Sequence, residues 1–149
     1  MARYGAVVKS ITASTSDDEI GITAGSGKSG KILEVHWGGE VTSSAAMCTR
    51  VARSSGQTGA TTAVTAAKFH PNAPANGMVF ESTFATTQPT LDAGDLFAES
   101  WNAHGGVVRW LAAPGEEMVI IGAATETVIS VRNSVGTSTS TYGMVTEED

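Results

Sequence analysis

A single cysteine, Cys48, stands in a chain that also has no long apolar run. One cysteine excludes an internal disulfide framework, and we expect Cys48 to be a buried or half-buried apolar side chain. The longest strongly apolar run, MVIIGAA, is far too short to cross a bilayer. The first residues lack an extended hydrophobic segment with a cleavage site, so we expect no secretory signal and synthesis in a reducing cytoplasm.

Positive charge is also scarce. Five arginines and four lysines are scattered singly along 149 residues, and the net charge is −6. No basic patch is present to neutralise phosphates, so we expect no direct contact with nucleic acid. Threonine (19) and serine (15) are instead abundant, which favours strands and turns over long helices. The length suits one domain with its own core.

The stretch AGSGKSGK, residues 24–31, resembles a phosphate-binding loop in composition. Such a loop needs a glycine five positions before its Gly-Lys pair, a buried strand before it and a helix after it. Ile22 occupies the glycine position, and the residues before the stretch, STSDDEIGIT, are acidic. The residues that follow, KILEVHW, alternate like a strand. We therefore interpret the stretch as a flexible turn that enters a strand.

Short strand-like segments recur along the chain, separated by glycine, proline, asparagine and serine. Leu33, Val35 and Trp37 share one face of KILEVHW, because side chains alternate along a strand. HGG, residues 104–106, predicts a tight turn that joins the flanking segments as a hairpin, and PGEE predicts a second turn. Segments 46–53 and 61–69 also fit a helical pattern. The expected strands are 4–11, 31–37, 46–53, 61–69, 78–84, 95–103, 107–113, 118–124, 126–133 and 141–148.

These segments predict an all-β fold: a single-domain antiparallel β-sandwich, jelly-roll-like, with extended N- and C-terminal segments. The domain covers residues 1–149, and residues 1–30 are a candidate N-terminal arm and loop. A two-sheet sandwich hides its inner faces without helices, which suits the small number of aromatic residues. The expected core residues are Leu33, Val35, Trp37, Phe80, Phe84, Phe97, Trp101, Trp110, Ile120, Ile129 and Val131.

Residues with the chemistry of a catalytic or metal site are few. His36, His70 and His104 are isolated from one another and from close carboxylates, so we interpret them as surface or turn residues. Asp92 and Asp95 could bind calcium weakly, but they fit better as turn residues that hydrogen-bond to the backbone. No G-x-S-x-G turn or cysteine–histidine pair marks a nucleophile. We therefore assign no catalytic, cofactor-binding or metal residues and expect neither an enzyme nor a cofactor, although a carboxylate pair brought together by folding stays open.

From about Lys31 onward the chain resembles small virion proteins of tailed bacteriophages. The resemblance lies in KILEVHWGGE, TRVARSS, KFHPNAPAN, FATTQPTLDAGDLFAESWNAHGGVVRWLAAPGEE and VRNSVGTSTSTYGMVTEED. It implies a β-sandwich decoration (cement) protein on the outer capsid surface, or a head–tail or tail accessory protein. It implies a structural role and transfers no active-site residues. The implied partners are the major capsid protein and further copies of the chain, as a dimer or trimer, with no membrane contact.

Two groups of residues are candidates for contacts in a virion. The acidic end, Glu147, Glu148 and Asp149, is the candidate capsid contact, because a chain of net charge −6 suits a basic footprint. The candidate inter-subunit arm is the glycine-rich segment 21–30, with Gly21, Gly25, Gly27, Lys28 and Gly30.

Two other readings remain open. A carbohydrate-binding or receptor-binding module on a phage tail would use Trp101 or Trp110 as a stacking surface, although core positions fit both residues better. A jelly-roll isomerase or glycan hydrolase would need a carboxylate pair or a three-histidine cluster in one pocket.

Overall fold

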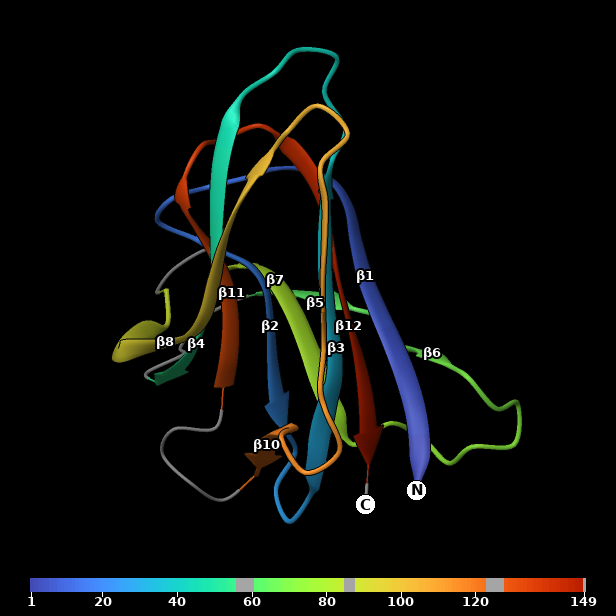
Figure 1. Cartoon of the computed structure of the whole chain (residues 1–149). Helices are drawn as coiled ribbons and strands as arrows, with labels where there is room; N and C mark the ends of the chain where they lie inside the picture. Colours follow the sequence, from blue (N-terminus) through green and yellow to red (C-terminus); the bar gives the residue numbers. More distant parts are fainter. Residues whose placement is uncertain (56–60, 85–87, 123–127, 149) are drawn as a thin grey trace.

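The computed structural model describes residues 1–55, 61–84, 88–122 and 128–148, which form two antiparallel sheets packed face to face (Figure 1). The predicted all-β antiparallel sandwich is confirmed. Sheet A has the order β10-β3-β12-β1-β6, with β9 also on β3, and sheet B has the order β5-β7-β2-β11-β4-β8. Sheet A contains β1 (Ala2–Thr12), β3 (Ser29–Gly39), β6 (Ala67–Lys68), β9 (Val107–Leu111), β10 (Met118–Ile121) and β12 (Thr139–Glu148); sheet B contains β2 (Asp18–Ala24), β4 (Ala46–Ser55), β5 (Thr61–Val64), β7 (Met78–Phe84), β8 (Thr90–Asn102) and β11 (Val128–Val135).

The two terminal strands lie inside sheet A. β1 and β12 pair along their whole lengths, from Ala2 opposite Glu148 to Thr12 opposite Thr139. Their first and last residues therefore lie side by side (Figure 1). The expected extended terminal segments are thus strands of the sandwich.

The predicted hairpin across residues 104–106 is wrong. β8 pairs with β4 in sheet B, whereas β9 pairs with β3 in sheet A, so the chain crosses between the sheets here. Buried Ala103 fixes the crossing, because its N–H donates to Ala45 O (3.0 Å) and its carbonyl accepts from Val41 N (3.4 Å). Within the residues that the structure describes, no strand is hydrogen-bonded to the strand next to it in sequence.

The PGEE turn does not reverse the chain into a partner strand either. β9 pairs with residues 34–38 of β3, and β10 pairs with residues 29–32 of the same strand. Residues 112–117 therefore leave the edge of sheet A and return to it further along β3.

Strand β2 was not expected, because STSDDEIGIT looks too acidic for a buried strand. All of β2 except Thr23 is buried, including Asp18 and Glu19. Ile20 and Ile22 point into the core, and partners described below neutralise or hydrogen-bond the two carboxyl groups. The glycine-rich stretch that follows therefore does have a buried strand before it, but it leads into strand β3, not into a helix.

The core between the sheets contains most of the predicted residues. Leu33 is the exception in β3, because the pairing with β12 passes from Glu34 directly to Ile32. This bulge turns Ile32 inward in place of Leu33. Phe97 and Trp110 are half-buried, and the Phe84 side chain lies outside the described residues. The predicted residues that are fully buried are Val35, Trp37, Phe80, Trp101, Ile120, Ile129 and Val131.

A chain of hydrogen bonds links the two sheets inside the core. Trp101 Nε1 of β8 donates to Thr49 Oγ1 of β4 (2.9 Å), and that hydroxyl donates to Asn133 Oδ1 of β11 (2.5 Å). Asn133 Nδ2 then donates to Tyr142 Oη of β12 in the other sheet (3.0 Å). Each of these four side chains thus has a partner, which offsets the cost of removing it from water.

Candidate functional site

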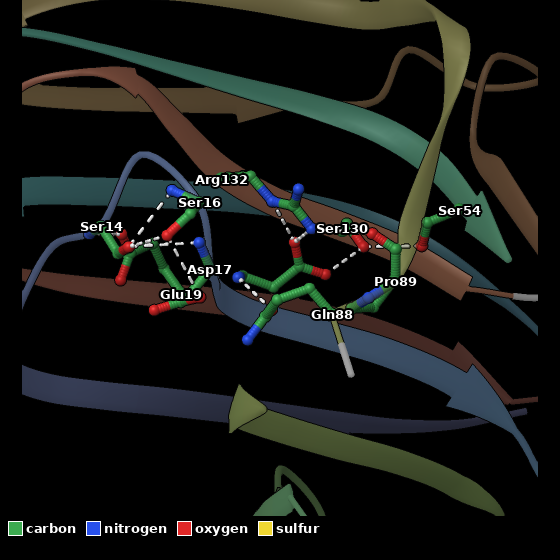
Figure 2. A network of polar contacts seen from close by, with 10 residues as sticks. Ser14, Ser16, Asp17, Glu19, Ser54, Gln88, Pro89, Ser130 and Arg132 are labelled. Carbon is green, nitrogen blue, oxygen red and sulfur yellow. Dashed lines mark hydrogen bonds and ion pairs between the residues drawn. The ribbon is translucent and has the colours of Figure 1, made fainter. Parts of the chain in front are cut away.

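A group of connected polar contacts lies on the outer face of sheet B (Figure 2). Ser130 and Arg132 alternate along β11 with the core residues Ile129 and Val131, so their side chains point away from the core. They are nevertheless buried or nearly so, because residues 88–89 lie over them before β8 begins.

Asp18 is at the centre of this group. Its carboxylate accepts from Arg132 Nε (2.7 Å), lies 2.6 Å from Arg132 Nη2, and accepts a short hydrogen bond from the Ser130 hydroxyl. Ser130 in turn shares a hydrogen bond with Ser54 of β4 (2.6 Å). Burial raises the pKa of Asp18, and Ser130 and Arg132 offset part of that rise. The ion pair is thus desolvated but fully hydrogen-bonded.

The covering segment is attached to the same pair. Arg132 Nη2 donates to Pro89 O (2.9 Å), and Asp18 N–H donates to Gln88 Oε1 (3.1 Å). The group therefore ties four stretches of chain together: the start of β2, the middle of β11, β4 and the residues that lead into β8.

Glu19 points to the other side of sheet B. The pairing of β2 with β11 passes from Ile20 directly to Asp18, so a bulge at Glu19 sets Asp18 on the outer face beside Arg132 although Ile20, two residues later, faces the core. Glu19 is 3% exposed and accepts a hydrogen bond from Ser14 N–H (2.5 Å). Burial raises the pKa of Glu19 to about 8. Burial also raises the pKa of Tyr142 to about 12, and the nearby Glu19 contributes to that rise.

The geometry of this group suits a structural clasp. Ser54 and Ser130 have no exposed surface, so a substrate cannot reach either hydroxyl. The two hydroxyl groups hydrogen-bond to each other and to Asp18, and no imidazole is among these partners to act as a general base. The sequence signal that could have revealed the clasp is the spacing of Ser130 and Arg132 on one face of a strand.

The candidate acidic end is largely occupied by contacts within the chain. Glu147 pairs with Arg3 (2.8 Å) on the outer face of sheet A. Glu148 is buried, accepts from Gly77 N–H (2.8 Å) and lies 3.3 Å from Lys28 Nζ. Asp149 lies outside the described residues. A capsid contact through Glu147 stays a prediction, whereas Glu148 is part of the fold.

The candidate arm is also built into the sandwich. Gly21 lies inside β2, opposite Ser130 on one side and Glu81 on the other. Gly25, Gly27 and Lys28 form the turn between β2 and β3, where Gly27 has a left-handed backbone (φ 71°).

Gly30, the last residue of that candidate arm, lies in β3. A Cβ atom added at Gly30 would lie 2.9 Å from the Glu147 carbonyl and 2.4 Å from the end of Met78. Close packing between strands therefore requires glycine at this position. A contact with another subunit stays a prediction for the turn alone.

An open groove lies beside the two termini. Its volume is about 540 Å³, and its walls come from the first residues of β1, the loop after β6 and Glu147. Phe69, 64% exposed, and His70 belong to that loop, which projects from the sandwich (Figure 1). The three histidines are far apart in the fold: His36 lies 3.1 Å from Glu34, His70 lines the groove and His104 is in the crossing between β8 and β9.

Other predicted positions are now assigned. Trp101 is buried and donates a hydrogen bond to Thr49, and Trp110 stacks on Phe97. Asp95 pairs with Arg50 (3.6 Å). Among the described residues, no three His, Cys, Asp or Glu side chains gather as metal ligands, and no helix is present that could cross a membrane.

Comparisons with protein-family models, with curated proteins and with solved structures found no match to this chain.

Proposed function

We propose that this chain is a non-enzymatic structural protein of a bacteriophage virion, which binds the outer capsid surface as a decoration, or cement, protein. Its partners are the major capsid protein and further copies of the chain, and it is made in the host cytoplasm. It bridges capsid subunits after assembly, and its binding free energy adds to the resistance of the shell.

The observation that carries this proposal is the order of the strands. Apart from β5, β6 and β7, which follow one another in the chain between β4 and β8, sheet A reads β1-β12-β3-β9/β10 and sheet B reads β2-β11-β4-β8. We infer that this order is a jelly roll, in which the chain winds alternately through two facing sheets. Viral capsid domains, lectins and cupins share that architecture, so the fold supports the proposal by analogy and the residues must separate the alternatives.

The residues favour a structural role over the tail-receptor alternative. A stacking surface made by Trp101 or Trp110 needs an exposed indole ring, but Trp101 is buried and Trp110 is half-buried against Phe97. The buried carboxyl groups hold strands together, as a rigid shell component requires. Ordered pairing of both terminal strands in sheet A also suits a protein that must persist without disulfides.

The location of the chain in the particle tests this proposal. Gold-labelled antibody against the chain should cover the heads of the phage whose genome encodes it. Label confined to the tail end would contradict the proposal and favour receptor binding. Particles stripped of the protein should also lose their DNA at a lower temperature, and purified chain added back should restore their heat resistance. Equal heat resistance with and without the chain would contradict a cement role.

A further inference from the structure

Among the residues that the structure describes, β9 is paired only with β3, which leaves the other side of its backbone free. At its two ends, Gly39 N–H donates to Gly106 O (3.1 Å) and Ala112 N–H donates to Leu33 O (2.9 Å). Because hydrogen-bonded residues alternate in an antiparallel pair, Val108 and Trp110 are the residues that bond to β3. The backbone N–H and C=O groups of Val107, Arg109 and Leu111 therefore face the free side of the edge.

The side chains of the same three residues lie on the outer face of sheet A. Val107 is 77% exposed and Leu111 is 57% exposed, so the outer face of this strand is apolar on both sides of its central residue. Arg109 lies between them and forms two hydrogen bonds with Glu34, at 2.8 and 2.7 Å. These bonds lower the pKa of Glu34. The Glu34 carboxylate and the Arg109 guanidinium are therefore both charged, and their net charge is zero.

Neighbouring edges of the sandwich carry features that block pairing with another chain. The Arg53 guanidinium covers the free Val119 carbonyl of β10, at 3.2 Å. Strand β8 carries Asp95 and Glu99 and is interrupted by register shifts against β4. The C-terminal part of β1 has a register shift between Val8 and Ile11, where Ser10 has a left-handed conformation (φ 53°). Charges and bulges of this kind are the usual protection of a sheet edge, and β9 has neither beyond its neutralised arginine.

We propose that β9 pairs with β9 of a second copy of the chain, antiparallel, across a two-fold axis at Arg109. This proposal rests on the self-association proposed above and names its interface. The sequence of the strand, Val-Val-Arg-Trp-Leu, is apolar at equal distances on either side of Arg109. The axis therefore sets Val107 of each copy opposite Leu111 of the other on the outer face.

The charges and the backbone both suit this arrangement. Arg109 faces Arg109 of the second copy, and each guanidinium is already paired with its own Glu34. The backbone groups that become paired are those left free by β3, so no existing hydrogen bond has to break. The two copies of sheet A would join into one continuous sheet, with Val107 and Leu111 covered at the join.

A charge exchange at these two positions tests the interface and its register. In the dimer, a single substitution, Leu111→Lys or Val107→Glu, changes both symmetric contacts between residues 107 and 111. Each apolar pair then becomes a pair of one apolar and one charged side chain, so each single variant should weaken the dimer roughly tenfold. The double variant sets lysine of one copy opposite glutamate of the other, twice, and should restore dimerisation. The two positions are about 13 Å apart within one copy, so the two new charges cannot pair with each other inside the monomer.

Sedimentation equilibrium over micromolar concentrations gives the dimer constant for each variant. Val119→Glu with Ile121→Lys is the matched control, because these exposed residues lie on the outer face of β10, outside the proposed join. The control should dimerise like the wild type, and urea unfolding should show that every variant is folded.

Each other outcome has a defined meaning. A wild-type chain that stays monomeric overturns the proposed self-association together with this interface. A wild-type dimer that ignores the single variants overturns this interface alone. Weakening without rescue in the double variant overturns the two-fold register at Arg109.

Discussion

The rings of Phe97 and Trp37 stack with their centroids 5.7 Å apart and their planes 13° apart, although the two residues belong to opposite sheets. Trp110 also stacks on Phe97, with the centroids 5.5 Å apart. Phe97 from sheet B thus stacks on two tryptophans of sheet A. The three rings close the side of the sandwich where the edge strands β8 and β9 meet.

Removal of the Phe97 ring should destabilise the fold. We expect Phe97→Ala to lower the free energy of unfolding by about 2–3 kcal/mol, less than a fully buried phenylalanine would cost because Phe97 is half-buried. Phe97→Leu keeps most of the apolar volume and should lose about 1 kcal/mol, the contribution of stacking. Urea unfolding followed by tryptophan fluorescence measures both values. A Phe97→Leu variant as stable as the wild type would contradict a specific role for stacking.

The Asp18–Arg132 pair should show strong coupling. Asp18→Asn or Arg132→Met leaves one buried charged group without its partner, and each should cost about 3 kcal/mol or more. The double variant removes both charges, so its cost should be smaller than the sum of the two single costs by about 1–3 kcal/mol.

A double-mutant cycle in urea measures this coupling. Arg50→Met with Asp95→Asn is the matched control, because that pair is about one-third exposed and 3.6 Å apart. Its coupling should be within about 1 kcal/mol of zero. Additive costs at Asp18 and Arg132 would show that the ion pair is not what holds β2 to β11.

Glu19 should make the protein less stable as the pH rises. Its pKa is about 8 in the folded chain, against 4.5 for an ordinary glutamate, so between these values the folded state binds the extra proton. The free energy of unfolding therefore falls through that window, and the contribution of Glu19 is fully present only below pH 4.5. Asp18 titrates in the same direction, since burial raises its pKa too.

Glu19→Gln isolates the effect of Glu19, because the amide keeps an acceptor for Ser14 N–H and carries no titrating proton. The stability of the variant relative to the wild type should increase by about 2–4 kcal/mol between pH 5 and pH 8. Unfolding curves at several pH values measure the difference. Parallel profiles for the two proteins would mean that Glu19 is ionised without cost in the folded state.

Two adjacent glutamates should respond very differently to truncation. Glu148→Ala leaves the Gly77 N–H without its acceptor and should cost about 1–3 kcal/mol. Glu147→Ala breaks an exposed pair with Arg3 and should cost less than about 1 kcal/mol. Thermal unfolding of the two variants measures the contrast. Capsid-binding experiments should therefore use Glu147→Ala, because deletion of the whole acidic end would also damage the fold.

The sequence predicted the fold class because alternation of apolar residues is a local property. Val35, Trp37, Ile129 and Val131 follow the simple period of a strand and are buried as expected. The bulge in β3 could not be predicted, because it depends on the partner strand β12. Leu33 was therefore wrongly assigned to the core, because the sequence of β3 alone does not show this bulge.

The clasp escaped prediction for a similar reason. Asp18 and Glu19 look like solvent-exposed residues until Arg132, 114 residues later in sequence, is placed beside Asp18. The glycine at position 30 resembles a flexible residue, whereas the structure needs it for close packing. Long-range partners decide both cases, and no local pattern contains them.

The absence of pairing between consecutive strands in the described chain has a kinetic consequence. Each strand pair in the described chain encloses at least one other strand, so no hairpin of consecutive strands can form first and serve as a template. Sheet A is the extreme case, since β12 lies between β1 and β3. During synthesis, β1 and β3 must wait without their common partner until the last ten strand residues leave the ribosome. The sandwich is therefore completed by its final strand, and refolding should be slow for a domain of this size.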